Sequence, residues 1–167
     1  MHAVTKKKSI ALFVIGLVSL AIAAPNSAMA AGATQADVDY TTKLSALTVE
    51  FGKVATDWGT AISSPPTLAF GSKWTKYKAA ATKSSNAVLA TVAKMSALVP
   101  SSGFTKSGAV LKKACSEYKS AITALNKGIV KNDTKLITKA NPLVAKASSD
   151  YLAWTKAYQA DLAALNG

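Results

Sequence analysis

The sequence predicts an all-α protein, a single antiparallel up-down-up-down four-helix bundle that follows an N-terminal signal peptide. Apolar residues recur three and four positions apart over four long segments, as they do on one face of a helix. Breaks rich in proline, glycine or asparagine near residues 63–66, 100–103 and 131–133 separate these segments, with hardly any strand-like alternation between them. Four amphipathic helices joined by short connections bury their apolar faces most simply as an antiparallel bundle.

The first thirty residues have the three parts of a secretory signal peptide. Lysines at residues 6–8 form the basic part, Ile10–Ala24 form an apolar run of fifteen residues, and Ala28 and Ala30 are the small residues of a cleavage site. A membrane-spanning helix needs about 20 apolar residues, so this run is too short for a retained anchor. We therefore expect cleavage before Ala31, a secreted, periplasmic or cell-surface location, and no stable membrane insertion afterwards.

The mature chain, residues 31–167, is long enough for one domain with its own core. The predicted helices cover residues 35–62, 67–99, 103–131 and 133–166, the last with a kink near residues 141–142. The kink is expected because Pro142 lacks a backbone donor and its ring clashes with the carbonyl group four residues earlier.

The first helix has a heptad seam and a predicted capping box. Thr34 and Asp37 are spaced so that a hydroxyl and a carboxylate serve the first backbone amides of the helix. Glu50 and Asp57 lie two turns apart on one flank, and we expect them to pair with lysines of a neighbouring helix. The seam residues are Tyr40, Leu44, Leu47, Phe51, Val54 and Trp58.

The other three helices repeat the pattern. In the second, polar Ser84 and Thr91 occupy seam positions, so Val92 and Leu89 are expected to take over as the face rotates. Asn132 is expected to end the third helix and Asp133 to cap the fourth. The second seam contains Phe70, Trp74, Tyr77, Ala81, Val88, Met95 and Leu98; the third contains Phe104, Gly108, Leu111, Cys115, Tyr118, Ile122, Leu125 and Ile129; the fourth contains Leu136, Ala140, Leu143, Ala147, Tyr151, Trp154, Tyr158, Leu162 and Leu165.

Lysine alone carries the positive charge of the chain. The sequence has 20 lysines, no arginine and eight acidic residues, and the mature chain keeps 17 of the lysines, for a formal charge of +9. Specific nucleic-acid binding is not expected, because arginine is the usual residue for specific phosphate recognition. The lysines either keep the surface solvated or attract an anionic polymer, such as a wall glycopolymer or a lipid surface. Those that fall beside or opposite the seams include Lys53, Lys76, Lys83, Lys106, Lys113 and Lys127.

The mature chain lacks the residues of the common catalytic and metal sites. Its single histidine, His2, belongs to the signal peptide, which removes the usual haem and zinc ligands and the base for a cysteine nucleophile. Cys115 is therefore expected to be a small core residue. We expect no catalytic residue, no cofactor and no metal.

The sequence predicts an exported, non-enzymatic, monomeric or weakly associating protein of the cell envelope or extracellular space. Its expected role is to bind anionic envelope polymers through a lysine-rich surface. The alternative is a small-molecule carrier with an aromatic-lined pocket between helices, although the same aromatic residues are expected to fill the core in either case. The candidate pocket residues are Trp58, Trp74, Tyr77, Tyr118, Tyr151 and Trp154.

Overall fold

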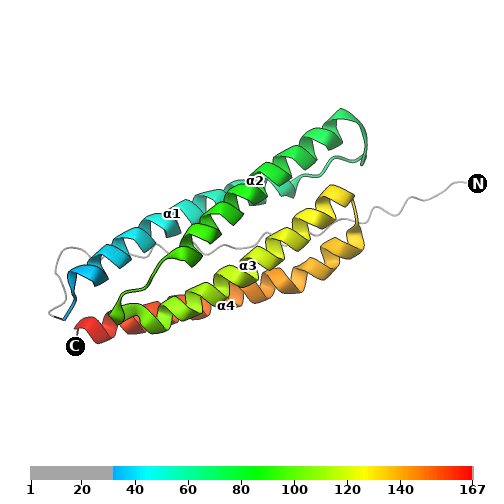
Figure 1. Cartoon of the computed structure of the whole chain (residues 1–167). Helices are drawn as coiled ribbons and strands as arrows, with labels where there is room; N and C mark the ends of the chain where they lie inside the picture. The colour runs from blue at the N-terminus through cyan, green and yellow to red at the C-terminus, as the bar shows by residue number, and fades with distance from the viewer. Residues whose placement is uncertain (1–31, 167) are drawn as a thin grey trace, which may run out of the picture.

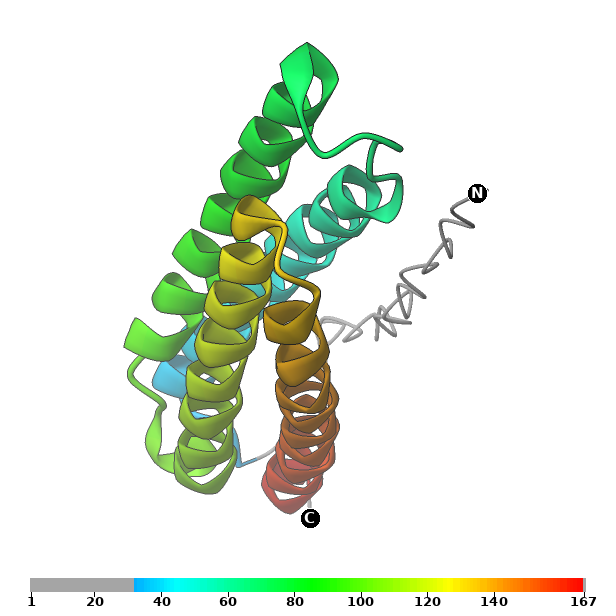
Figure 2. The same cartoon turned by 90° about the vertical axis from the view of Figure 1, so that its right-hand side faces the viewer.

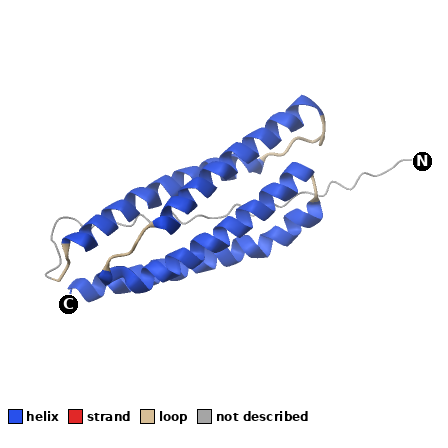
Figure 3. Ribbon diagram, viewed as in Figure 1, coloured by secondary structure: helices blue, strands red, loops and turns tan. Residues whose placement is uncertain are grey.

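All of the secondary structure that the computed structural model describes, over residues 32–166, is helical (Figure 3). The helices span Gln35–Ser63 (α1), Gly71–Ala97 (α2), Ser102–Phe104 (the short 3₁₀ helix η1), Thr105–Lys131 (α3) and Thr134–Asn166 (α4). The predicted all-α class with four long helices is confirmed. The predicted signal peptide and its cleavage residues Ala28, Ala30 and Ala31 lie outside the described residues.

Each long helix lies beside the one before it in the chain, and successive helices run in opposite directions (Figures 1 and 2). The most extensive pairing is between α3 and α4. By contrast, over the described helices α1 and α4 no two Cα atoms come within 8 Å of each other. Large side chains span the distance between these two backbones: the ring of Phe51 on α1 stacks on that of Tyr151 on α4, with 5.7 Å between centroids.

The connections determine where the helices begin and end. The second helix starts at Gly71 rather than at the predicted residue 67, because residues 64–70, which include two prolines, form an irregular connection. Gly71 has a φ of 78°, which glycine adopts at little cost. The helix then ends at Ala97, before Pro100, in a segment where Leu98 is already extended. Pro142 lies inside α4 and does not end it.

The buried face of α1 differs from the predicted seam. Leu47 and Val54 are only half-buried, whereas Thr48 and Ala55, one position further on, are buried. A straight helix of 3.6 residues per turn drifts relative to a strict heptad, which moves the core face by about one residue. Thr48 is tolerated there because its hydroxyl donates a hydrogen bond to the Leu44 carbonyl, 2.8 Å away.

The other seams are confirmed to different degrees. All eight residues of the third seam are buried, and so are Ala140, Ala147 and the aromatic residues of the fourth, whose four leucines are only half-buried. In the second helix Val92 is buried as expected and Leu89 is half-buried, but Thr91 is buried beside Val92 and donates to Glu50 of α1 at 2.9 Å. The prediction for Phe70 was wrong: it precedes α2, has an extended backbone and is 70% exposed.

The α3–α4 turn is built as the sequence predicts. Asn132 ends α3 with the left-handed conformation φ 52°, and its N–H donates to carbonyls of the last turn. Asp133 caps α4 because its Oδ1 accepts hydrogen bonds from the N–H groups of Lys135 (2.9 Å) and Leu136 (3.1 Å). Gly128 allows the two helices to approach closely here, since a Cβ at this residue would lie 2.9 Å from the Ile137 backbone nitrogen.

Asp37 joins the start of α1 to the α2–α3 connection. The predicted capping box with Thr34 is confirmed, with 2.8 Å between the Thr34 N–H nitrogen and Asp37 Oδ2. The other carboxylate oxygen accepts from the Ser101 hydroxyl at 2.6 Å and from the Gly103 N–H at 3.3 Å. Hydrogen bonds from Ser101 and Thr34 lower the pKa of Asp37 from 3.8 to about 2, so this buried carboxylate is charged.

Between residues 32 and 166, no single helix has the length and apolar character to cross a membrane. α2 and the segment Ser102–Lys131 have the required length and apolar character only when they are taken together, and they are bent by 118° at the break between them.

Replacing the buried carboxylate is expected to lower stability in a pH-dependent way. Asp37→Asn should reduce the free energy of unfolding by about 1–3 kcal/mol at neutral pH, because buried donors lose a charged acceptor. The folded pKa lies below the unfolded value, so the carboxylate's contribution is present above about pH 4 and is lost as the pH falls toward 2. Urea unfolding at several pH values measures both effects.

The matched control is Asp39→Asn, since Asp39 is exposed and accepts a hydrogen bond from Gln35 on the helix surface. Its effect should be within about 0.5 kcal/mol. An Asp37→Asn deficit equal to that of the control, or one that stays constant down to pH 2, would contradict this role of Asp37.

The close approach of α3 and α4 gives a second test. Gly128→Ala should destabilise the protein by about 1–3 kcal/mol, because the new methyl group overlaps the Ile137 backbone. Gly52→Ala in α1 is the control: no atom lies within 4 Å of its added Cβ, so the better helix propensity should stabilise by about 0.5–1 kcal/mol. We expect the two substitutions to change the free energy of unfolding, measured with urea, in opposite directions. Changes in the same direction would contradict the close packing at Gly128.

Candidate functional site

The six aromatic residues of the predicted pocket lie in separate parts of the interior. Trp74 and Tyr77 form a pair at the start of α2, with ring centroids 5.3 Å apart. Tyr118 of α3 and Tyr151 and Trp154 of α4 lie together further along, while Trp58 is buried near the end of α1. All except the half-buried Tyr77 are buried, so they contribute to the core.

A continuous row of rings fills the space between α1 and the α3–α4 pair. Successive ring centroids lie between 4.9 and 6.0 Å apart, mostly in tilted or edge-on arrangements. Such contacts are favourable beyond the burial of area alone. In order along the row, the members are Tyr40, Phe104, Tyr158, Trp154, Tyr151, Tyr118 and Phe51.

Three polar atoms of aromatic side chains are buried without a hydrogen-bond partner among the described residues. They are the Tyr40 hydroxyl, the Trp58 Nε1 and the Trp154 Nε1. Burial raises the pKa of Tyr40 to about 12, so its hydroxyl stays protonated and can donate. Buried donors of this kind usually find a protein or water partner, which makes them of interest for a bound ligand.

Cys115 is a core residue, as predicted. Its thiol is free and 4% exposed within the third seam. Burial raises the pKa of the thiol to about 12, which suppresses the reactive thiolate.

The carboxylates away from the α1–α2 and α3–α4 connections mostly bind to other parts of the fold. Glu50 accepts from Lys94 and Thr91 of α2, and the Lys94 contact is the main cause of its lowered pKa. Asp150 pairs with Lys113 and Lys146, which also lower its pKa. Within residues 32–166, no group of three or more metal-binding side chains comes together.

Two other acidic residues complete this pattern. Glu117 pairs with Lys146, and Asp161 accepts the backbone N–H of Ser107 at 2.9 Å near the start of α3. The expected pairing of Glu50 with a lysine on a neighbouring helix is confirmed by its contact with Lys94 of α2. The same expectation was wrong for Asp57, which is exposed and has no ion pair over the described part of the chain.

The two ends of the molecule differ sharply in charge. We compare the outermost eight residues of each long helix together with the connections between them. The end that holds the α1–α2 and α3–α4 connections has seven lysines and two acidic residues, a formal charge of +5. The opposite end has three lysines and three acidic residues, and so no net charge. The lysine-rich end is defined by Lys73, Lys76, Lys78, Lys127, Lys131, Lys135 and Lys139.

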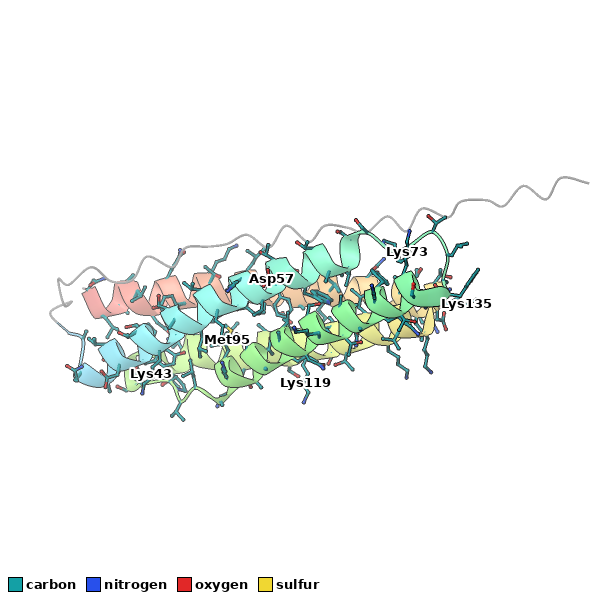
Figure 4. All side chains as sticks on the ribbon, turned by 90° about the horizontal axis from the view of Figure 1, so that it is seen from above. Lys43, Asp57, Lys73, Met95, Lys119 and Lys135 are labelled. Carbon is teal, nitrogen blue, oxygen red and sulfur yellow. The ribbon has the colours of Figure 1, made fainter. Side chains whose placement is uncertain are left out.

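The lysines of this end come from three helices and face solvent. Six are exposed and Lys78 is half-buried. Figure 4 shows Lys73 of α2 and Lys135 of α4 at the same end of the molecule, with Lys43 at the opposite end. All four ion pairs of the described chain involve other lysines. Of the two acidic residues here, Asp133 is engaged by backbone N–H groups and Asp57 remains exposed.

The start of α2 adds to the positive character of the lysine-rich end. This helix has no side-chain cap at Phe70 and no acidic residue in its first turn. The positive end of its dipole is therefore not offset by a carboxylate of its own. The connection that leads into it, residues 64–70, has no charged residue.

The α1–α2 connection also presents apolar side chains to solvent. Leu68 is 57% exposed and Phe70 is 70% exposed. The base of the connection is fixed, because Trp74 and Ile62 are buried and the Tyr77 hydroxyl donates to the Ile62 carbonyl at 3.1 Å. The exposed pair therefore projects from a packed support.

The predicted exposure of the lysines beside the seams is confirmed, but their concentration at one end was missed. Lys53, Lys76, Lys83, Lys106, Lys113 and Lys127 are all exposed. The predicted antiparallel order already brings the first turns of α2 and α4 to the same end as the last turns of α3, but the charge was not compared between the two ends. The available signal was the absence of acidic residues from residues 58–116, most of which form α2 and its connections.

No protein-family model matches the chain, and searches of curated proteins and of solved structures find no significant similarity.

The burial of Cys115 predicts its reactivity. In the native protein at pH 8, the thiol should react with a disulfide reagent about a hundredfold or more slowly than in the urea-unfolded chain, because its pKa is raised to about 12. The absorbance of the released reagent, followed over time under native and unfolding conditions, measures the two rates. Comparable rates in a protein that is shown to be folded would contradict the buried position.

Proposed function

We propose that this is an exported, non-enzymatic protein whose four helices form an up-down-up-down bundle, and that it attaches to anionic envelope material through its lysine-rich end. The observation that carries the proposal is the charge difference between the two ends, +5 against zero. The signal-peptide pattern of residues 1–30 supports the location, since it directs the mature chain to the envelope.

The lysine cluster has an energetic cost that a bound anion would relieve. Three pairs of these lysines lie three or four residues apart on one helix, so their ammonium groups repel each other: Lys73 with Lys76, Lys127 with Lys131, and Lys135 with Lys139. None of the seven belongs to an ion pair in the described structure. The Debye length is about 8 Å at physiological ionic strength, so only neighbouring lysines reinforce one another. Their combined field favours a surface or polymer with many closely spaced negative charges.

The use of lysine favours diffuse attraction over recognition of one defined group. Lysine is a flexible, strongly hydrated point charge, whereas arginine has a planar fork suited to bidentate contacts. A lysine surface therefore binds anions of varied geometry, with an affinity that falls as salt rises. Long helices at 1.5 Å per residue make a body about 40–50 Å long, so end-on attachment leaves the end without net charge away from the surface.

A second candidate function is that of a small-molecule carrier. The observation that favours it is three buried donors, on Tyr40, Trp58 and Trp154, without partners in the described chain. A ligand with an acceptor atom would satisfy one of them. Tyr40 and Trp58 lie about 27 Å apart along α1 at 1.5 Å per residue, so one small molecule does not reach both. Denaturing extraction and mass spectrometry of protein purified from its producing cells would test this: a stoichiometric small molecule supports a carrier, and its absence contradicts it.

The charge proposal predicts that the position of the lysines matters more than their number. In K73Q/K76Q/K131Q/K135Q, affinity for isolated cell envelopes at moderate salt should fall about tenfold or more, because each lysine near an anionic surface contributes about 1 kcal/mol. The matched control K43Q/K106Q/K112Q/K156Q removes the same charge elsewhere and should cost less than about threefold. Co-sedimentation over a salt series measures both variants.

Circular dichroism and urea unfolding would show that both variants remain folded. Equal losses in the two variants would mean that net charge alone is responsible. Binding that does not weaken as salt rises would also contradict the proposal, since exposed charges are screened by salt.

A further inference from the structure

We propose that the anionic partner of the lysine-rich end is a phospholipid membrane, and that Leu68 and Phe70 enter its headgroup region while the surrounding lysines contact the lipid phosphates. This inference rests on the proposed function and names the partner of the same surface. It adds an apolar contribution that attraction between charges does not provide.

Half of the exposed large apolar residues lie at the same end as the lysines. Six large apolar side chains of the described chain are exposed, and three of them, Leu68, Phe70 and Val130, lie at the lysine-rich end. Leu68 and Phe70 share the uncharged α1–α2 connection, and Phe70 is three residues from Lys73. Val130 precedes Lys131 in the last turn of α3. The other three lie outside this end: Val49 on α1, Val99 in the α2–α3 connection and Leu152 on α4.

The backbone directs Phe70 away from the core. An apolar heptad position at residue 70 would bury the ring, but Phe70 has the extended conformation φ −150° and ψ 172°. Gly71 then turns the chain into α2 with φ 78°. The core below is already filled by Trp74, which is 8% exposed. The ring of Phe70 therefore stays in solvent although buried Trp74, which pairs with Tyr77, lies one turn away.

A membrane surface accommodates both features, whereas a soluble polyanion accommodates one. Lysines satisfy the negative headgroups, and apolar side chains at the headgroup–acyl boundary leave water. A wall polymer or nucleic acid would contact the lysines but leave Leu68 and Phe70 exposed. Insertion of a short connection is peripheral binding and requires no membrane-spanning helix.

The test uses protein expressed as the full 167-residue chain and selected by intact mass for the form that begins at Ala31. Binding is measured to vesicles of equal parts phosphatidylglycerol and phosphatidylcholine, to pure phosphatidylcholine vesicles and to soluble polyphosphate. The variant L68S/F70S should bind the anionic vesicles about tenfold or more weakly than the parent, because two apolar side chains no longer leave water. Its binding to polyphosphate should be unchanged.

The control V49S/V99S replaces two other highly exposed apolar side chains and should bind vesicles as the parent does. In a Phe70→Trp variant, an additional blue shift of fluorescence on anionic vesicles, absent with polyphosphate, would report entry of residue 70 into lipid. The background from buried Trp58, Trp74 and Trp154 is subtracted with the parent protein.

The outcomes separate this inference from the proposed function. The membrane inference is overturned if L68S/F70S binds anionic vesicles like the parent while K73Q/K76Q/K131Q/K135Q loses binding to both vesicles and polyphosphate. A soluble polyanion is then the partner. If the parent binds neither vesicles nor polyphosphate at low salt, the proposed function fails as well.

Discussion

The wide separation of α1 and α4 is the constraint on which the rest of the structure depends. Because their backbones do not come within 8 Å over the described helices, small residues cannot close the fold on this side. Aromatic rings do so instead: Phe51 reaches Tyr151 across the gap, and Tyr40 meets Phe104 of η1, which stacks on Tyr158. The alanine-rich α3–α4 pair packs tightly, while α1 is held to it by large side chains. This division explains why the aromatic residues belong to the core.

Polar contacts also join the helices at one end of the molecule. Asp37 ties the start of α1 to the α2–α3 connection, and Asp161 of α4 binds the first turn of α3. Glu50 and Asp150 are neutralised by lysines of adjacent helices nearer the middle. Most carboxylates are thus used by the fold away from the lysine-rich end. The excess of lysine at that end remains, and the α1–α2 connection adds two exposed apolar side chains to it. One end stabilises the fold, and the other is available for attachment.

Much of this fold could be predicted from spacing alone, because burial in a helical protein follows periodicity. The third seam was predicted in full, and the capping residues Thr34, Asp37 and Asp133 were identified because short polar side chains at helix starts have a local role. The shift from Leu47 to Thr48 could not be predicted, since it depends on how α1 sits against its neighbours. Nor could the exposure of Phe70, which depends on the positive φ of Gly71. The lysine-rich end follows from the predicted antiparallel order once the charge is compared end by end, because that order brings the first turns of α2 and α4 to the same end as the last turns of α3.

The most direct measurement is the distribution of the native protein among the medium, a salt wash of the surface and the membranes of its producing cells, with the intact mass in each fraction. We expect a species that starts at Ala31, stays with the membranes at low salt and is released progressively as salt rises. The same species free in the medium at low salt would contradict attachment through the lysine-rich end. A membrane-bound species that retains residues 1–30 would contradict the predicted cleavage and attribute retention to the uncleaved apolar segment.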